Sequence, residues 1–157
     1  MVIDVRIRKL QPADIPSIAH LLRDLAEEFI TPEFDANAQC VFLEKNNQSA
    51  IEQFIADGFL YYVAEDGGNR IGFVGVRDNK HLYHLFVAKP FQRQGLGRRL
   101  WETVMNECCA AGNPGRFTVN SSNNAVAIYE RLGFFRTAPT QNNNGVLFNP
   151  MALQTNA

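Results

Sequence analysis

The glycine turn at residues 92–97 constrains this chain more than any other feature of its sequence. Its six residues, Gln-Arg-Gln-Gly-Leu-Gly, lie between an apolar run, Leu82–Val87, and a helical stretch, Arg98–Cys109. This order predicts a strand, a tight turn and the start of a helix. Gly95 and Gly97 remove the β-carbons where an anion would approach the backbone, and the helix directs unpaired N–H groups and its positive dipole end to the same point. The turn therefore predicts a phosphate-binding site.

Two well-known phosphate loops do not fit this turn. A P-loop requires Lys-Ser or Lys-Thr after its second glycine, and Arg98 and Arg99 stand there. A dinucleotide fingerprint requires a third glycine in the region of Leu100. The two glycines taken alone could equally serve only to connect a strand to a helix. A second motif is needed to choose between these interpretations.

That second motif is present, and the two together resemble one enzyme family. The hexapeptide fits the pattern Gln/Arg-x-x-Gly-x-Gly/Ala, and Leu85–Pro90 is similar to the strand and turn before the pyrophosphate loop of that family. Farther on, Ala125–Phe134 is similar to the family's second signature, a helix that carries a tyrosine and ends in Gly-Phe. On these segments the chain resembles the GNAT superfamily of N-acetyltransferases, which bind acetyl-coenzyme A. The clear resemblance covers Lys80–Phe135.

The resemblance implies a fold and a co-substrate. It implies an α/β (α+β) GNAT fold: a single domain over residues 1–157, with a mixed, mainly antiparallel sheet, a splayed strand pair and about four flanking helices. Acetyl-CoA would place its pyrophosphate on the N–H groups of residues 93–98 and its pantetheine along a splayed strand, with no metal required. The implied cofactor-binding residues are Phe86, Val87, Gln92, Arg93, Gln94, Gly95, Leu96, Gly97, Arg98 and Asn120.

Tyr129 is the expected general acid. It shares an apolar helical stripe with Ile128 and Leu132, so it could simply be a core residue. When an amine attacks a thioester, however, the departing thiolate gains a proton, and a phenol with a pKa of about 10 is a competent donor. In the family the tyrosine at this position lies beside the sulfur. We therefore favour a catalytic role for Tyr129.

The expected general base is His81. Histidine titrates closest to neutral pH, and both His81 and His84 lie on the strand before the glycine turn. Strand alternation sends these two side chains to opposite faces of the sheet, so we expect at most one of them at the acetyl group. His84, Tyr83 or a water molecule remain alternatives, as does a histidine without a catalytic role.

Hydrophobic periodicity indicates the remaining elements. Ile3, Val5 and Ile7 alternate with polar residues as in a strand, and apolar residues recur at helical spacing from Asp14 to Phe29. Pro150 cannot donate to a ladder, so the last strand should be an edge or carry an irregularity. The other expected elements are a loop within Ile30–Gln48, a helix at about Ser49–Ala56, a hairpin of Phe59–Ala64 and Ile71–Val76, strands at Lys80–Ala88, Phe117–Asn120, Phe134 onward and Val146–Leu153, and a helix at about Asn123–Leu132.

Composition agrees with a small cytoplasmic enzyme. The chain has 157 residues and a formal net charge of −1, which provides no electrostatic reason for nucleic-acid or membrane binding. It begins without the basic and then apolar order of a signal peptide. Its three cysteines, Cys40, Cys108 and Cys109, lack metal-ligand spacing, and we expect them to be reduced and mostly buried.

The resemblance implies an enzyme that transfers an acetyl group from acetyl-CoA to a primary amine of a small molecule. Two alternatives stay open: a peptide or protein N-terminal acetyltransferase, and a non-catalytic acyl-CoA-binding regulatory module, against which Tyr129 counts. We expect Ile30–Ala56, which has no motif, to choose the acceptor. A homodimer is compatible with the sequence.

Overall fold

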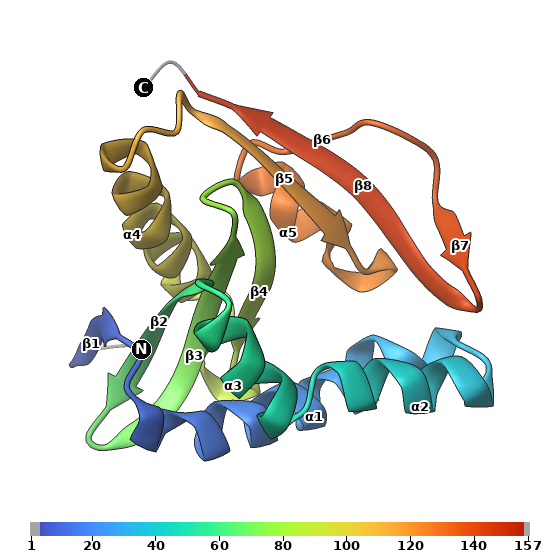
Figure 1. Ribbon diagram of the computed structural model, residues 1–157, viewed down its shortest axis with the longest axis horizontal. Helices are drawn as coiled ribbons and strands as arrows, with labels where there is room; N and C mark the ends of the chain where they lie inside the picture. Colours follow the sequence, from blue (N-terminus) through green and yellow to red (C-terminus); the bar gives the residue numbers. More distant parts are fainter. Residues whose placement is uncertain (1–3, 156–157) are drawn as a thin grey trace.

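The computed structural model describes residues 4–155, which form one mixed sheet with helices on both of its faces (Figure 1). The strand order is β1-β2-β3-β4-β5-β8-β6, and β7 pairs with the far part of β8. Every pairing is antiparallel except that of β4 with β5. The strands are β1 (Val5–Lys9), β2 (Leu60–Asp66), β3 (Asn69–Arg77), β4 (His81–Val87), β5 (Arg116–Ser121), β6 (Phe135–Arg136), β7 (Gln141–Asn143) and β8 (Val146–Gln154).

Five α-helices surround this sheet, one more than the sequence indicates. They are α1 (Ile15–Phe29), α2 (Ala36–Lys45), α3 (Gln48–Ala56), α4 (Leu96–Ala110) and α5 (Val126–Arg131), with short 3-10 turns η1 (Pro12–Asp14), η2 (Thr31–Glu33), η3 (Lys89–Phe91) and η4 (Asn123–Ala125). In the part of the chain that the structure describes, no helix has the length and apolar character needed to cross a membrane.

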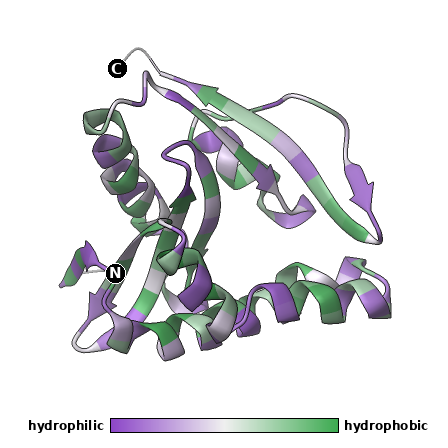
Figure 2. Cartoon of the chain, in the orientation of Figure 1, coloured by the Kyte–Doolittle hydropathy of each residue, from purple (hydrophilic) through white to green (hydrophobic). Residues whose placement is uncertain are grey.

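The additional helix, α2, lies in the segment for which we expected a loop. Asp35 caps its N-terminus by accepting a hydrogen bond from the Ala38 N–H at 2.8 Å. Only Ala38 is buried among its residues, and apolar and polar positions are interspersed along it (Figure 2). A helix without a continuous apolar stripe has no periodic signal, which is why the sequence pattern did not reveal it.

Strands β4 and β5 diverge after a very short pairing, as expected. They form parallel pairs only at His81 with Thr118 and at Leu82 with Val119. Beyond these pairs β4 continues to Val87 and β5 to Ser121 without further pairing between the strands, so the sheet divides into two arms (Figure 1). The expected mixed, mainly antiparallel sheet with a splayed strand pair is therefore confirmed.

Two hydrophobic clusters hold the helices against the sheet. One cluster joins α4 and α5 to the sheet and contains Trp101 and Tyr129. The other joins α1 and α3 to the opposite face and contains Ile18, Ile51 and Phe73. Of the three cysteines, Cys108 is buried in the first cluster, whereas Cys40 is exposed, contrary to the expectation for it. All three are free thiols.

Pro150 lies at a break along the outer side of β8. Val146–Phe148 pair with β7, and Met151 and Ala152 pair with β6, so residues 149–150 fall between these two short partners. The Pro150 carbonyl accepts from the Thr137 N–H at 3.0 Å, which shows that its nitrogen also faces this outer side. The missing N–H therefore costs β8 no hydrogen bond with β5, and the strand stays continuous through the proline.

Candidate functional site

The turn between β4 and α4 leaves a row of backbone N–H groups without an intramolecular acceptor. Gly95 is the N-cap of α4 with φ of 82°, and Arg93 also has a positive φ, 63°. Before this row, the Gln92 N–H bonds to Lys89 O, and after it the Arg99 N–H bonds to Gly95 O at 3.1 Å. Among the described residues, the N–H groups of residues 93–98 therefore remain available to an external anion.

The space above these N–H groups is open. A β-carbon built on Gly95 would meet no atom within 4 Å, and one built on Gly97 would meet only Val87 Cγ2, at 3.9 Å. The two glycines thus keep side chains away from the N–H row rather than relieving a steric clash within the fold. This arrangement fits a phosphate group that approaches the backbone directly.

One edge of β4 is free beyond the point where β5 leaves it. The Ala88 N–H bonds to Ile71 O at 2.7 Å, so by strand alternation the backbone groups of Phe86 face β3, and those of Leu85 and Val87 face the opening. The side chain of Gln92, in the glycine turn, reaches back to this edge: its Nε2 donates to Val87 O at 2.9 Å. The free edge of β4 and the glycine turn at residues 92–97 are therefore joined by a side chain of the turn itself.

The arginines of the turn have different environments. Arg98 Nη2 donates to Arg131 O at 2.7 Å, and Arg99 Nη2 donates to Val5 O at 3.4 Å. All three arginines are exposed, but among the described residues only Arg98 and Arg99 have a hydrogen bond from the guanidinium to the protein. Of the three cationic side chains, Arg93 is the most available to a bound anion.

Tyr129 is buried in the cluster that also contains Leu96 of α4. Its ring packs edge-on against Phe134 with the ring centroids 5.7 Å apart. Burial raises the pKa of its hydroxyl well above the ordinary value, and no charge or hydrogen bond from the described residues contributes to that shift. The phenol is therefore protonated at neutral pH and its proton is not committed to another group of the protein.

His81 lies where β4 and β5 begin to diverge. Its Nδ1 is 2.7 Å from Thr118 Oγ1, in the residue with which it pairs across the two strands. Burial, reinforced by the positive charges of Arg77 and Lys80, lowers the pKa of His81 to about 4, against a smaller opposing effect of Asp78. The imidazole is therefore neutral at pH 7 and has a lone pair that can accept a proton.

A β-bulge overturns the expectation that His81 and His84 face opposite sides of the sheet. Val76 pairs with Leu82 and Gly75 pairs with His84, which leaves Tyr83 without a partner on β3. One extra residue reverses the alternation of side chains that follow it. His84 accordingly contacts the Tyr83 ring, with centroids 4.7 Å apart, and Tyr83 lies 6.4 Å from the His81 ring. All three rings lie on the sheet face opposite α4.

His84 is nevertheless held in a closed network. Its Nε2 lies 2.8 Å from Asn46 Oδ1 and its Nδ1 lies 2.8 Å from the Tyr61 hydroxyl. Since the amide oxygen only accepts, Nε2 carries the hydrogen and Nδ1 accepts from Tyr61. Burial lowers the pKa of His84 to about 3. His84 is thus a neutral structural residue, and His81 is the histidine of this pair that borders the opening.

Asn120 and its surroundings form the second arm of the opening. Asn120 is exposed near the end of β5, on the face away from Val119 and the α4 cluster. Behind it, the Asn149 side chain is fully buried and donates to Ser121 O and Asn123 Oδ1. Asn149 was missed by sequence reasoning, although a single asparagine in the apolar run Val146–Leu153 was a signal for a buried polar contact.

Two contacts bring the segment before α2 and the second arm together. Asn123 Nδ2 donates to Glu33 Oε2, which joins η4 to η2. Gly145, in the turn between β7 and β8, packs so closely on Asp35 and Ala38 that a β-carbon there would overlap the carboxylate of Asp35. Helix α2 therefore lies across the tip of the β7–β8 hairpin (Figure 1). The expected acceptor segment, Ile30–Ala56, thus reaches both arms.

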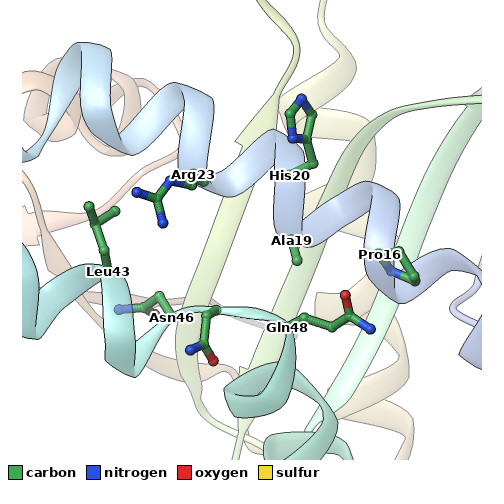
Figure 3. A pocket seen from close by; sticks show the side chains of 8 residues that line it. Pro16, Ala19, His20, Arg23, Leu43, Asn46 and Gln48 are labelled. Carbon is green, nitrogen blue, oxygen red and sulfur yellow. The ribbon is translucent and has the colours of Figure 1, made fainter.

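The described residues contain two notable pockets on the side of α1 and α3. One lies between α1 and the turn from α2 to α3, with Pro16 and Ala19 of α1 on one side and Asn46 and Gln48 on the other (Figure 3). The other is lined by Phe54, Tyr83 and their neighbours and lies beside the opening. Among residues 4–155, no group of three or more His, Cys, Asp or Glu side chains is arranged to hold a metal ion.

Comparison with known proteins agrees with this geometry. Residues 27–155 match the model of a family described as an acetyltransferase (GNAT) domain. No curated protein sequence matches the chain. A GCN5-related N-acetyltransferase structure from Rhodopseudomonas palustris has a TM-score of 0.82 at 19% identity over 99% of both chains. The PaiA N-acetyltransferase from Thermoplasma acidophilum, solved with coenzyme A, has a TM-score of 0.77 at 18% identity over 98% of this chain and 100% of that one.

A third similar structure is the ribosomal-protein-S18-alanine N-acetyltransferase from Escherichia coli. Its TM-score is 0.68 at 23% identity, with 96% of this chain and 94% of that chain covered. At these identities the structures establish a shared fold, and the family model provides the assignment. The resemblance expected from the glycine turn and the tyrosine segment is confirmed.

Proposed function

Because the chain belongs to the GNAT acetyltransferase family, we propose that it transfers an acetyl group from acetyl-CoA to the primary amine of a small molecule. Three features of the described residues support the proposal, and the row of free backbone N–H groups carries it. These are the N–H row at residues 93–98, the free edge of β4 and the uncommitted phenol of Tyr129.

Acetyl-CoA would bind from the turn inward. Its pyrophosphate oxygens accept hydrogen bonds from the N–H groups of residues 93–98 at the positive end of α4. Its pantetheine extends the sheet by pairing with the backbone of Leu85 and the N–H of Val87, which face the opening, while the Val87 carbonyl stays bonded to Gln92. A main-chain N–H of this edge polarises the thioester carbonyl as charge develops on its oxygen. Asn120 faces the same opening from the second arm and contacts the lower pantetheine or the acceptor.

The transfer then needs one proton acceptor and one proton donor. The amine nitrogen attacks the carbonyl carbon, the new C–N bond forms, and the C–S bond breaks with its electron pair leaving on sulfur. Tyr129 gives its proton to that thiolate and regains one from solvent. His81 takes the proton that the amine loses; because its pKa is about 4, it passes this proton on to water rather than holding it.

The closure of the far side of the opening supports a small acceptor. The contacts of Glu33 with Asn123 and of Gly145 with Asp35 join the segment before α2 to the second arm of the sheet. Unlike an extended peptide, a small amine needs no continuous groove between the arms. This observation favours a small-molecule enzyme over a peptide or protein N-terminal acetyltransferase.

The test is amine-dependent release of CoA thiol from acetyl-CoA, measured across amines, amino acids, polyamines, aminoglycosides and short peptides. We expect turnover with at least one small amine, and a loss of about 100-fold in Tyr129→Phe with little change in CoA affinity. Tyr62→Phe is the matched control, because Tyr62 donates to Glu107 away from the opening. Tight CoA binding without turnover on any amine would instead identify a regulatory module.

A further inference from the structure

A pocket of about 300 Å³ lies beside the divergence of β4 and β5. Its walls are formed by Phe54 and Tyr83, and Lys45, Ala50 and Gln53 complete its lining. Tyr83 directly follows Leu82, the last residue of β4 that pairs with β5. The pocket therefore begins where the two strands part, on the same face of the sheet as His81.

The walls of this pocket are aromatic and held in place. The ring of Phe54 meets that of Tyr83 edge-on with centroids 5.0 Å apart, and Phe59 stacks on Phe54 at 4.8 Å. Tyr83 follows His81 in the regular alternation of β4, which directs its ring toward α3, and the bulge after it places the His84 ring on the same face. A preformed aromatic pocket of this size suits the apolar side chain of a small ligand.

Charged groups of both signs lie near this pocket: Asp57 accepts a hydrogen bond from the lining residue Gln53 at 2.9 Å, and two cations are also present. Lys45 lies on the lining, and the Arg77 guanidinium lies 5.8 Å from the centre of the Tyr83 ring. Asp78 contacts only the Nε side of Arg77, at 3.7 Å. The charged groups that act on the neighbouring His81 are Arg77, Lys80 and Asp78, two cations against one anion. The Tyr83 side of the pocket, with Arg77 beside it, therefore favours an anionic group.

We propose that the acceptor is an apolar α-amino acid whose side chain fills the Phe54–Tyr83 pocket, whose carboxylate faces Arg77 and Lys45, and whose amine is presented beside His81. This inference rests on the proposed function and specifies its substrate class. A polyamine or an aminoglycoside would place its cationic groups against Arg77 and Lys45, which is unfavourable. A peptide lacks the carboxylate next to the reacting amine.

The first experiment compares amino-acid acceptors with an amine that lacks the carboxylate and with two polycationic amines. L-phenylalanine and L-leucine are measured against phenethylamine, which lacks the carboxylate, and against spermidine and kanamycin. We expect kcat/KM for L-phenylalanine to exceed that for phenethylamine by about tenfold or more, the scale of one charge-assisted contact. Faster turnover of spermidine or kanamycin than of either amino acid would overturn the inference while leaving acetyl transfer intact.

The second experiment measures binding and does not depend on turnover. N-acetyl-L-phenylalanine is titrated calorimetrically into the CoA-loaded protein, its Arg77→Gln and Lys45→Gln variants, and an Arg6→Gln control on the remote strand β1. We expect both pocket variants to weaken binding several-fold and the control to leave it unchanged. Absence of binding to the CoA-loaded wild type would overturn the inference, whereas failure to bind CoA at all would overturn the proposed function.

Discussion

Arg98 ties the phosphate-binding turn to the tyrosine helix: its Nη2 donates to the Arg131 carbonyl at 2.7 Å. Arg98 lies in the first turn of α4, and Arg131 is the last residue of α5. Since α5 also carries Tyr129, this one hydrogen bond links the N–H row that would hold the pyrophosphate to the element that would protonate the thiolate. This hydrogen bond therefore contributes to the relative position of the glycine turn and α5.

Arg98→Met is expected to weaken this link without removing a phosphate contact. The side chain keeps its apolar stem but loses its donor, so the free energy of unfolding should fall by about 0.5–1 kcal/mol. The preference for CoA over 3′-dephospho-CoA should stay as in the wild type, whereas Arg93→Met should reduce it. Calorimetric affinities for both ligands decide the matter: if Arg98→Met alone erases the preference, Arg98 binds the ribose phosphate directly.

Substitutions at Gly97 are expected to reduce coenzyme affinity in proportion to their size. A β-carbon there is tolerated by the fold, with Val87 Cγ2 at 3.9 Å, but a larger side chain would fill the space above the N–H row. We expect a small loss for Gly97→Ala and a loss of at least 100-fold in affinity for Gly97→Val, which is about 2.7 kcal/mol. Circular dichroism checks the fold, and unchanged CoA affinity in folded Gly97→Val would rule out this binding site.

The glycine turn could be predicted from sequence because its chemistry is local. Gly95 and Gly97, the strand before them and the helix after them are consecutive in the chain, so spacing alone indicates the N–H row. The tyrosine helix is local in the same sense. The splayed strands could be inferred only through the family resemblance, since the pairing of His81 with Thr118 joins residues far apart in sequence.

The acceptor side could not be predicted because it depends on contacts between distant residues. The bulge at Tyr83 changes which face His84 occupies, and no residue of β4 signals it. Helix α2 lacks an apolar stripe, and the contact of Glu33 with Asn123 spans 90 positions of the sequence. Periodicity describes single elements, and these features arise only when elements meet.

The pH dependence of turnover should show no inflection from His81 near its ordinary pKa. Burial lowers the pKa of His81 to about 4, so the imidazole is already neutral and able to accept a proton throughout pH 5–9. The rise of kcat/KM with pH should therefore follow the deprotonation of the acceptor amine and shift when a less basic amine is used. An inflection near pH 6.5 that disappears in His81→Asn would show that the site raises this pKa above about 4.

Asp14 is expected to be the main ionic contribution to stability. Its carboxylate is buried and accepts from Arg8 Nη1 at 2.8 Å, from Arg70 Nε at 2.8 Å and from the Gln11 N–H at 2.8 Å. Asp14→Asn leaves the Arg70 guanidinium without this anion and leaves Arg8 with Glu65 alone, so we expect the free energy of unfolding at pH 7 to fall by about 3 kcal/mol. Glu65→Gln, which removes a more exposed partner of Arg8, is the control and should cost much less.

Acid should reduce this contribution in a defined range. The hydrogen bonds from Arg8 hold the pKa of Asp14 far below its ordinary value, so the unfolded chain takes up the proton first as pH falls. The stabilisation is therefore complete above about pH 4 and is lost progressively below it. His81 and His84, whose pKa values are lowered to about 4 and about 3, also become destabilising as the pH falls. Their effect begins at about pH 6.5 and is at most about 1.4 kcal/mol per pH unit each.

Urea unfolding at pH 7, 5 and 3.5 separates the contribution of Asp14 from that of the histidines. The difference in the free energy of unfolding between wild type and Asp14→Asn should be equal at pH 7 and 5 and smaller at pH 3.5. A difference that already shrinks between pH 7 and 5 would mean that the histidines, through their own protonation, disrupt the Asp14 cluster as well.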